Sequence, residues 1–65
     1  MNQGLEETMP TYRANLIDDD NRVASYRAIE AATDEQALEV AKQLVDGHDV
    51  EVWLLDREIG RLKRN

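Results

Sequence analysis

Only one segment of the chain has the periodicity of an amphipathic helix. It begins at a capping box, Thr33-Asp34-Glu35-Gln36, in which the threonine hydroxyl and the glutamine side chain can each accept a backbone N–H. Its apolar residues then recur at helical spacing and form one stripe: Ala37, Leu38, Ala41, Leu44 and Val45. Gly47 is the expected left-handed cap at the end of this helix. Since no second helix is indicated, strands must supply the rest of the core.

Before the helix, the sequence predicts a hairpin of two strands. The first has the period of two that is typical of a half-buried strand, because apolar and polar residues alternate: Tyr12, Arg13, Ala14, Asn15 and Leu16. Asp18-Asp19-Asp20-Asn21 interrupts this pattern, and Asn21 tolerates the left-handed conformation that a tight hairpin needs. Residues 23–31 are again extended, with apolar residues on both faces, which leaves their register open.

After the helix, residues 50–62 predict a second hairpin. Val50 and Val52 point to one face of the first strand, whereas Glu51 and Trp53 point to the other. Asp56 is the best turn former of this segment, so we expect the turn within 54–57. The largest apolar side chain of the chain is thus expected on the face that does not meet the helix.

The resulting fold is α+β, with the element order ββαββ. A right-handed crossover through the helix makes strands two and three parallel in direction. Strand one fits between them, which gives a four-stranded antiparallel sheet of order 2-1-3-4 with one helix packed on one face. We expect one domain over residues 11–65, preceded by a flexible N-terminal tail over residues 1–10.

Length and composition limit how this domain can gain stability. A chain of 65 residues buries only about 60% of the surface that its unfolded form exposes. It has no cysteine and one histidine, His48, which excludes disulfides and sites built from thiolates or several histidines. Association with a partner chain is the supplement that stays open. The net charge of −6 argues against a general nucleic-acid binder.

The sequence also gives an expectation about location. No apolar run approaches the ~20 residues of a membrane span, and the N-terminal MNQGLEET lacks the charged-then-apolar pattern of a signal peptide. We therefore expect a cytoplasmic protein with no membrane segment.

Three patterns in the chain resemble a group of short bacterial proteins of unknown function: Y-R-x-x-L-x-D-x-D-x-R, A-T-D-E-x-A-L-x-x-A-x-x-L-V-D-G-H-D-V-E-V-W and R-x-x-G-R-L. Together they run from Tyr12 to Leu62, and the best-matching segment is 46–53. The chain departs from the group at Asn21, where glycine is usual, and at Leu54-Leu55, where a polar residue and glycine are common. The resemblance implies a compact α+β domain and no activity.

Catalytic and metal chemistry find little support in the sequence. His48 beside Asp49 has the composition of a base and its orienting carboxylate, but neighbours at a helix exit more often solvate the cap. The run 18–21 offers oxygen ligands without the spacing of a calcium loop, so a solvated turn is the better interpretation. We expect no catalytic residue, no metal site and no cofactor, and hence no enzyme.

The open sheet face is the candidate interaction face, and it is expected to carry Trp53, Arg13, Asn15, Glu51 and Arg61. Trp, Tyr and Arg dominate binding hot spots. The leading hypothesis is a protein–protein interaction domain that forms a homodimer, with an unknown protein partner also possible. The alternative is an accessory module for single-stranded nucleic acid that uses Trp53 and the basic C-terminal strand. A third interpretation is intramolecular, with Arg stems or the N-terminal Leu5 and Met9 covering Trp53.

Overall fold

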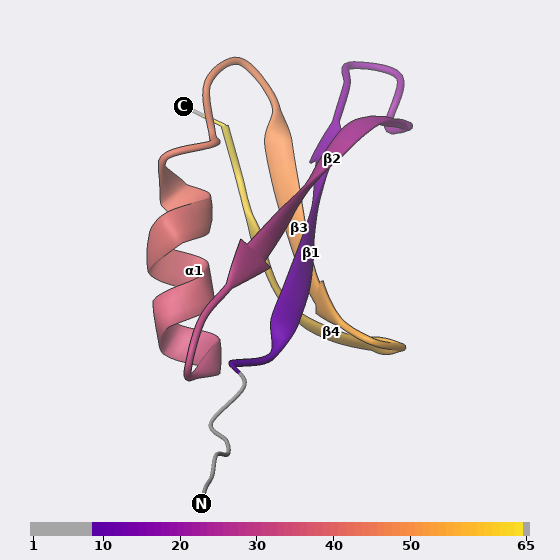
Figure 1. Ribbon diagram of the computed structural model, residues 1–65. Helices are drawn as coiled ribbons and strands as arrows, with labels where there is room; N and C mark the ends of the chain where they lie inside the picture. Colours follow the sequence, from indigo (N-terminus) through magenta and orange to yellow (C-terminus); the bar gives the residue numbers. More distant parts are fainter. Residues whose placement is uncertain (1–8, 65) are drawn as a thin grey trace, which may run out of the picture.

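The computed structural model describes residues 9–64 and confirms the expected ββαββ order. The strands are β1 (Thr11–Ile17), β2 (Val23–Glu30), β3 (Asp49–Leu54) and β4 (Arg57–Leu62), and the helix is α1 (Asp34–Lys42). Figure 1 shows α1 lying along one side of the sheet. Most of the expected N-terminal tail, residues 1–8, lies outside the described residues.

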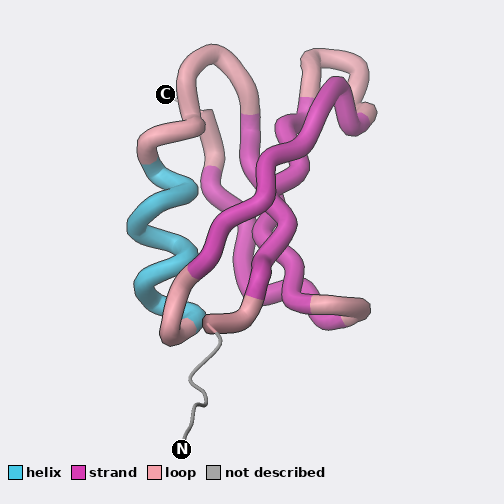
Figure 2. The backbone as a smooth tube through the Cα atoms, viewed as in Figure 1, coloured by secondary structure: helices cyan, strands magenta, loops and turns pink. Residues whose placement is uncertain are grey.

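The four strands form one antiparallel sheet in the order β2-β1-β3-β4, as the sequence predicts. In the described part of the chain, no helix covers the face opposite α1 (Figure 2). Residues directly opposite each other in paired strands point to the same face, so the register defines two rows on this open sheet face. The row nearer the β3–β4 turn, called the upper row, is Ala28, Arg13, Trp53 and Glu58. The row nearer the β1–β2 turn, called the lower row, is Tyr26, Asn15, Glu51 and Arg61.

The core lies between the sheet and α1, and it is small. Its largest fully buried side chains are Tyr12, Val50 and Val52, and the Tyr12 hydroxyl donates a 2.7 Å hydrogen bond to Asp34 Oδ1. This hydrogen bond and burial raise the pKa of Tyr12. Leu16, Ile17 and Ile29 are also buried, but four of the ten buried apolar residues among those described are alanines, so the core is limited for a chain of this length.

The smallest residues of the apolar stripe are its most deeply buried ones. Ala37 and Ala41 are fully buried, whereas the larger side chains of the stripe, Leu38, Leu44 and Val45, are only partly buried around them. Leu38 lies against Gly60 of β4, where an added Cβ atom would lie 3.2 Å from Leu38 Cδ2 and would require a small shift of that side chain.

Both ends of α1 refine the sequence prediction. The Thr33 hydroxyl accepts the Gln36 N–H at 3.1 Å as expected, but the Gln36 side chain accepts the N–H of Ala32. The expected cap at Gly47 is wrong, because α1 ends at Lys42 and Gln43 is its C-cap. The chain then continues in tight turns, in which the N–H of Leu44 bonds to Ala41 at 2.9 Å. Gly47 has a φ of 86° but serves the following loop.

The first hairpin turn is held by an aspartate. Asp18 Oδ1 accepts the backbone N–H groups of Asp20 at 2.9 Å and of Arg22 at 3.0 Å. Asn21 takes the left-handed conformation predicted for it, with a φ of 64°. The acidic run therefore has a local structural role, since its first carboxylate satisfies the turn.

The second hairpin turns at Leu55 and Asp56, within the range that the sequence predicts. Leu55 has a φ of 58°, which leucine rarely adopts, and its side chain is 90% exposed. Just beyond the turn the register shifts between Val52 and Trp53, so that Ile59 is the extra residue of a bulge. The turn thus holds an apolar side chain in solvent at a conformational cost.

Replacing Leu55 with glycine is expected to stabilise the domain by about 0.5–1 kcal/mol. The left-handed region costs a residue with a Cβ about 1–2 kcal/mol, and the greater entropy of unfolded glycine offsets part of that gain. Urea denaturation at low protein concentration measures the change. Asp56→Gly is the matched control, because Asp56 has no positive φ and gains no relief. A Leu55→Gly protein that is less stable than wild type would show that the backbone conformation of Leu55 is not strained.

Candidate functional site

All five residues of the predicted interaction face lie on the open sheet face. Arg13 and Trp53 are neighbours in the upper row, and Asn15, Glu51 and Arg61 are neighbours in the lower row. They come from β1, β3 and β4, so the sheet register brings together residues that are up to 48 positions apart. The register places Trp53 on the face of β3 that points away from Val50 and Val52, as the sequence predicts.

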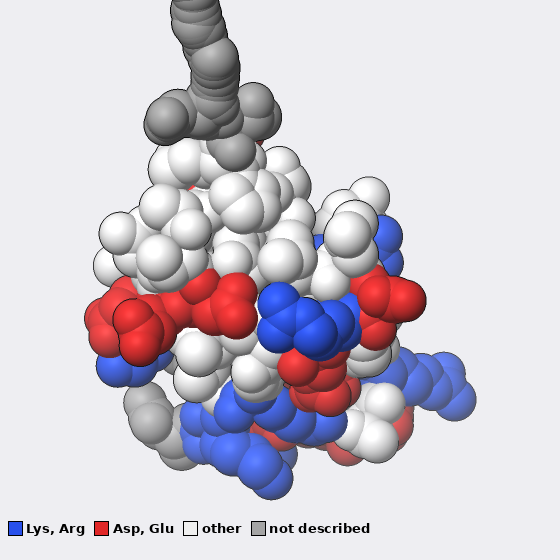
Figure 3. Space-filling view, turned by 90° about the horizontal axis from the view of Figure 1, so that it is seen from below, with Lys and Arg blue, Asp and Glu red and all other residues white. Residues whose placement is uncertain are grey.

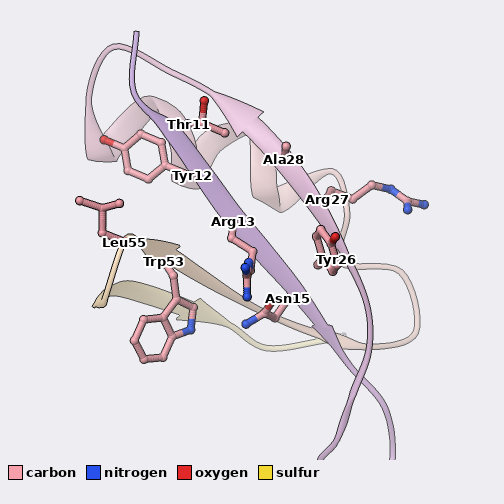
Figure 4. Close-up of a pocket in the computed structure, with 9 residues that line it drawn as sticks. All are labelled: Thr11, Tyr12, Arg13, Asn15, Tyr26, Arg27, Ala28, Trp53 and Leu55. Carbon is pink, nitrogen blue, oxygen red and sulfur yellow. The ribbon is translucent and has the colours of Figure 1, made fainter.

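A hollow of about 530 Å³ occupies the end of this face above β1. Figure 4 shows Arg13 between Tyr26 of β2 and Trp53 of β3, with Leu55 at the adjoining turn. Tyr26 is 62% exposed and Leu55 90% exposed, while Trp53 is half-buried. The lining is completed by Thr11, Tyr12, Asn15, Arg27 and Ala28. The hollow therefore combines apolar walls with a cationic floor.

Arg13 is held at the floor of the hollow by an aromatic ring. Its guanidinium carbon lies 5.2 Å from the centroid of Tyr26, within the range of a cation–π contact. No side chain among residues 9–64 forms an ion pair with Arg13. Glu58, two strands away in the same row, likewise has no ion-pair partner in this part of the chain.

A hydrogen-bonded chain fixes the lower row. Trp53 Nε1 donates to Glu51 at 3.3 Å, and Arg61 donates to Glu51 at 3.1 Å and to Asp49 at 3.0 Å. The backbone N–H of Arg64 also donates to Asp49 at 2.9 Å, and this bond, with Arg61, lowers the pKa of Asp49. The hydrogen bond from Nε1 orients the edge of the indole ring toward Glu51.

The basic C-terminal segment is matched by carboxylates of its own chain. Arg57 lies 3.6 Å from Asp34, Arg61 pairs with Asp49 and Glu51, and Arg64 pairs with Asp19. Acidic and basic groups adjoin each other in the view from below (Figure 3). Such pairing reduces the positive potential that would attract a phosphate backbone.

The two sequence patterns considered for chemistry are not brought together into a site. Asp49 binds the two arginines, while the enclosed Nε2 atom of His48 has no hydrogen-bond partner among the described residues. In residues 9–64, no group of three or more His, Cys, Asp or Glu side chains is placed to hold a metal ion. No helix in this range has the length and apolar character that crossing a membrane requires.

Sequence reasoning missed three residues of the open sheet face: Tyr26, Leu55 and Glu58. Tyr26 could have been found by pairing residues 23–31 with the first strand across the Asn21 turn, which places it opposite Asn15. The bulge at Ile59 moves Glu58 opposite Trp53, and nothing in the sequence marks that bulge. Leu55 lies within the turn predicted at 54–57, but nothing in the sequence marks its left-handed conformation.

Comparison with protein-family models, curated proteins and solved structures found no match.

Proposed function

We propose that this protein is a non-enzymatic protein–protein interaction domain that self-associates through its open sheet face. The observation that carries the proposal is the set of aromatic and apolar side chains around the hollow: Trp53, Tyr26 and Leu55. Aromatic residues with a neighbouring arginine have the composition of an interface centre. A second copy of the chain is the simplest occupant, since it requires no other component.

The small core supports association as a source of stability. In a domain of 65 residues whose largest fully buried side chains are one tyrosine and two valines, further apolar burial is valuable. A partner that binds only the folded chain stabilises it by mass action. Burial of the open sheet face in a dimer would thus add to the apolar burial of the limited core.

The size of the face sets the expected strength of the dimer. Four strands spaced at about 4.8 Å and six residues long give a face of roughly 20 Å by 20 Å. An interface of that size covers about 400 Å² on each copy, or about 800 Å² in total, which is below the standard size and in the range of weak, transient contacts. We therefore expect a dissociation constant in the micromolar range and exchange between monomer and dimer.

Binding of single-stranded nucleic acid is less well supported as the function. Trp53 and Arg13 offer stacking and charge, but Arg57, Arg61 and Arg64 are paired with carboxylates. The net charge of −6 also opposes phosphate binding. A titration with short oligonucleotides at low salt, followed by Trp53 fluorescence, tests this alternative directly.

Sedimentation equilibrium of the full chain tests the proposed dimer. Concentrations from about 1 µM to several hundred micromolar span the dissociation constants expected for a small interface. The weight-average mass is expected to rise toward twice the monomer mass, and the melting temperature is expected to rise with it. A monomer mass at every concentration, with a constant melting temperature, would contradict self-association.

A further inference from the structure

The open sheet face is arranged so that it can pair with a copy of itself. Its two central strands, β1 and β3, present Arg13 opposite Trp53 in one row and Asn15 opposite Glu51 in the next. If β3 of one copy lies over β1 of another, Trp53 faces Arg13 and Glu51 faces Asn15. These are pairs of groups that bind each other.

Building on the proposed self-association, we propose a specific geometry for the dimer. The two sheets pack face to face, related by a two-fold axis that lies between them, runs close to the strand direction and passes between β1 and β3. Such an interface is isologous, so each contact occurs twice. It also keeps the strands of the two copies within about 30° of each other, as in aligned sheet packing.

In this geometry the hollow receives the Trp53 side chain of the second copy. The hollow lies above β1, between Tyr26 on β2 and Trp53 on β3. The two-fold axis places β3 of the second copy over β1, and hence its Trp53 over Arg13. The incoming indole then meets the Arg13 guanidinium between two aromatic side chains, a cation–π arrangement.

The same rotation supplies an ion-pair partner for Arg13 and for Glu58, neither of which forms an ion pair within residues 9–64. Glu58 lies on β4 and Ala28 lies on β2, so β4 of the second copy brings its Glu58 over Ala28. The small alanine side chain leaves room for that carboxylate to reach Arg13, which is adjacent to Ala28 in the row. Two Arg13–Glu58 pairs form across the interface, which avoids burying the Arg13 charge without a counter-ion.

The lower row is complementary under the same operation. Asn15 faces Glu51 of the second copy, and Tyr26 faces Arg61 of the second copy. Other axes parallel to the strands are less favourable. An axis along β1 sets Arg13 against Arg13, and an axis along β3 sets Glu51 against Glu51 and brings Glu58, in place of Trp53, over Arg13.

Two charge reversals in the full-length chain test this geometry. In its own dimer, Arg13→Glu sets a carboxylate against Glu58 at both contacts, and Glu58→Arg sets a guanidinium against Arg13 at both contacts. Each variant alone is expected to self-associate at least about ten-fold more weakly than wild type, because like charges facing each other are unfavourable. In an equimolar mixture, each heterodimer has one native contact between Arg13 and Glu58. In its other contact, the carboxylate of Arg13→Glu meets the guanidinium of Glu58→Arg. Both contacts therefore pair opposite charges, and the heterodimer is expected to form within about three-fold of the wild-type affinity.

Sedimentation velocity of each variant and of the mixture measures these affinities, and circular dichroism checks that both variants fold. Contacts within each chain are the same in the mixture as in the separate variants, so recovery reports only contacts between chains. Lys42→Glu, a charge reversal on the exposed part of α1, is the control and is expected to leave association unchanged. A mixture no tighter than its components, with a wild-type dimer, would overturn this geometry alone. A wild-type protein that stays monomeric would overturn the proposed function as well.

Discussion

Replacing Leu16 with alanine is expected to lower the free energy of unfolding by about 2–5 kcal/mol, through lost apolar transfer and the cavity left behind. Leu16 is 7% exposed and lies on the interior strand β1, opposite Val50 of β3. A chain of this length has a total stability of only about 3–10 kcal/mol. The variant should therefore be partly or largely unfolded at room temperature, which urea denaturation followed by circular dichroism measures.

Leu55→Ala is the matched control for this experiment, because it removes the same atoms from a side chain that is 90% exposed. At protein concentrations where the chain is monomeric, this control is expected to change stability by less than about 0.5 kcal/mol. Equal losses in the two variants would show that β1 does not face the core as described.

Replacing Trp53 with alanine is expected to weaken self-association by about 2–4 kcal/mol, or roughly 30- to 1,000-fold in the dissociation constant. Each dimer would lose two indole rings from the centre of its interface. The dependence of melting temperature on concentration should disappear with them, since the monomer no longer gains stability by mass action. Sedimentation equilibrium and thermal melts over a hundred-fold concentration range measure both effects.

Val40→Ala is the control for the loss of an exposed apolar side chain, because Val40 is 43% exposed on α1, on the other side of the sheet. It is expected to leave association unchanged. A large fall in the melting temperature of Trp53→Ala at every concentration, with no concentration dependence in wild type, would show instead that Trp53 acts within its own chain.

The sequence is sufficient for the topology because local patterns agree with one another. The capping box fixes the start of α1, and the alternation around Tyr12 and Val50 fixes which faces of β1 and β3 meet it. The end of the helix was not predictable from Gly47, because residues 43–45 can continue in tight turns after Lys42. That Ala37 and Ala41 are the most deeply buried residues of the helical stripe depends on how α1 packs against the sheet in three dimensions.

The open sheet face was predictable in part for a similar reason. Period-two alternation places Arg13, Asn15, Glu51 and Trp53 on one face without knowledge of their neighbours. Tyr26 and Glu58 depend on the register of β2 and on the bulge in β4, which are properties of strand pairs. The hollow is formed jointly by residues of β1, β2, β3 and the turn after β3. No single stretch of sequence therefore predicts it.

The strand order β2-β1-β3-β4 has a consequence for synthesis of the chain on the ribosome. The first hairpin and the helix emerge before β3, so one edge of the interior strand β1 stays unpaired until Asp49–Leu54 has been made. Pairing β1 with β3 also requires closing a loop that contains β2 and α1, and such distant contacts slow folding. The segment made before β3 should thus behave as a nascent chain with an exposed strand edge, and the sheet should form in one cooperative step once β3 and β4 have been made.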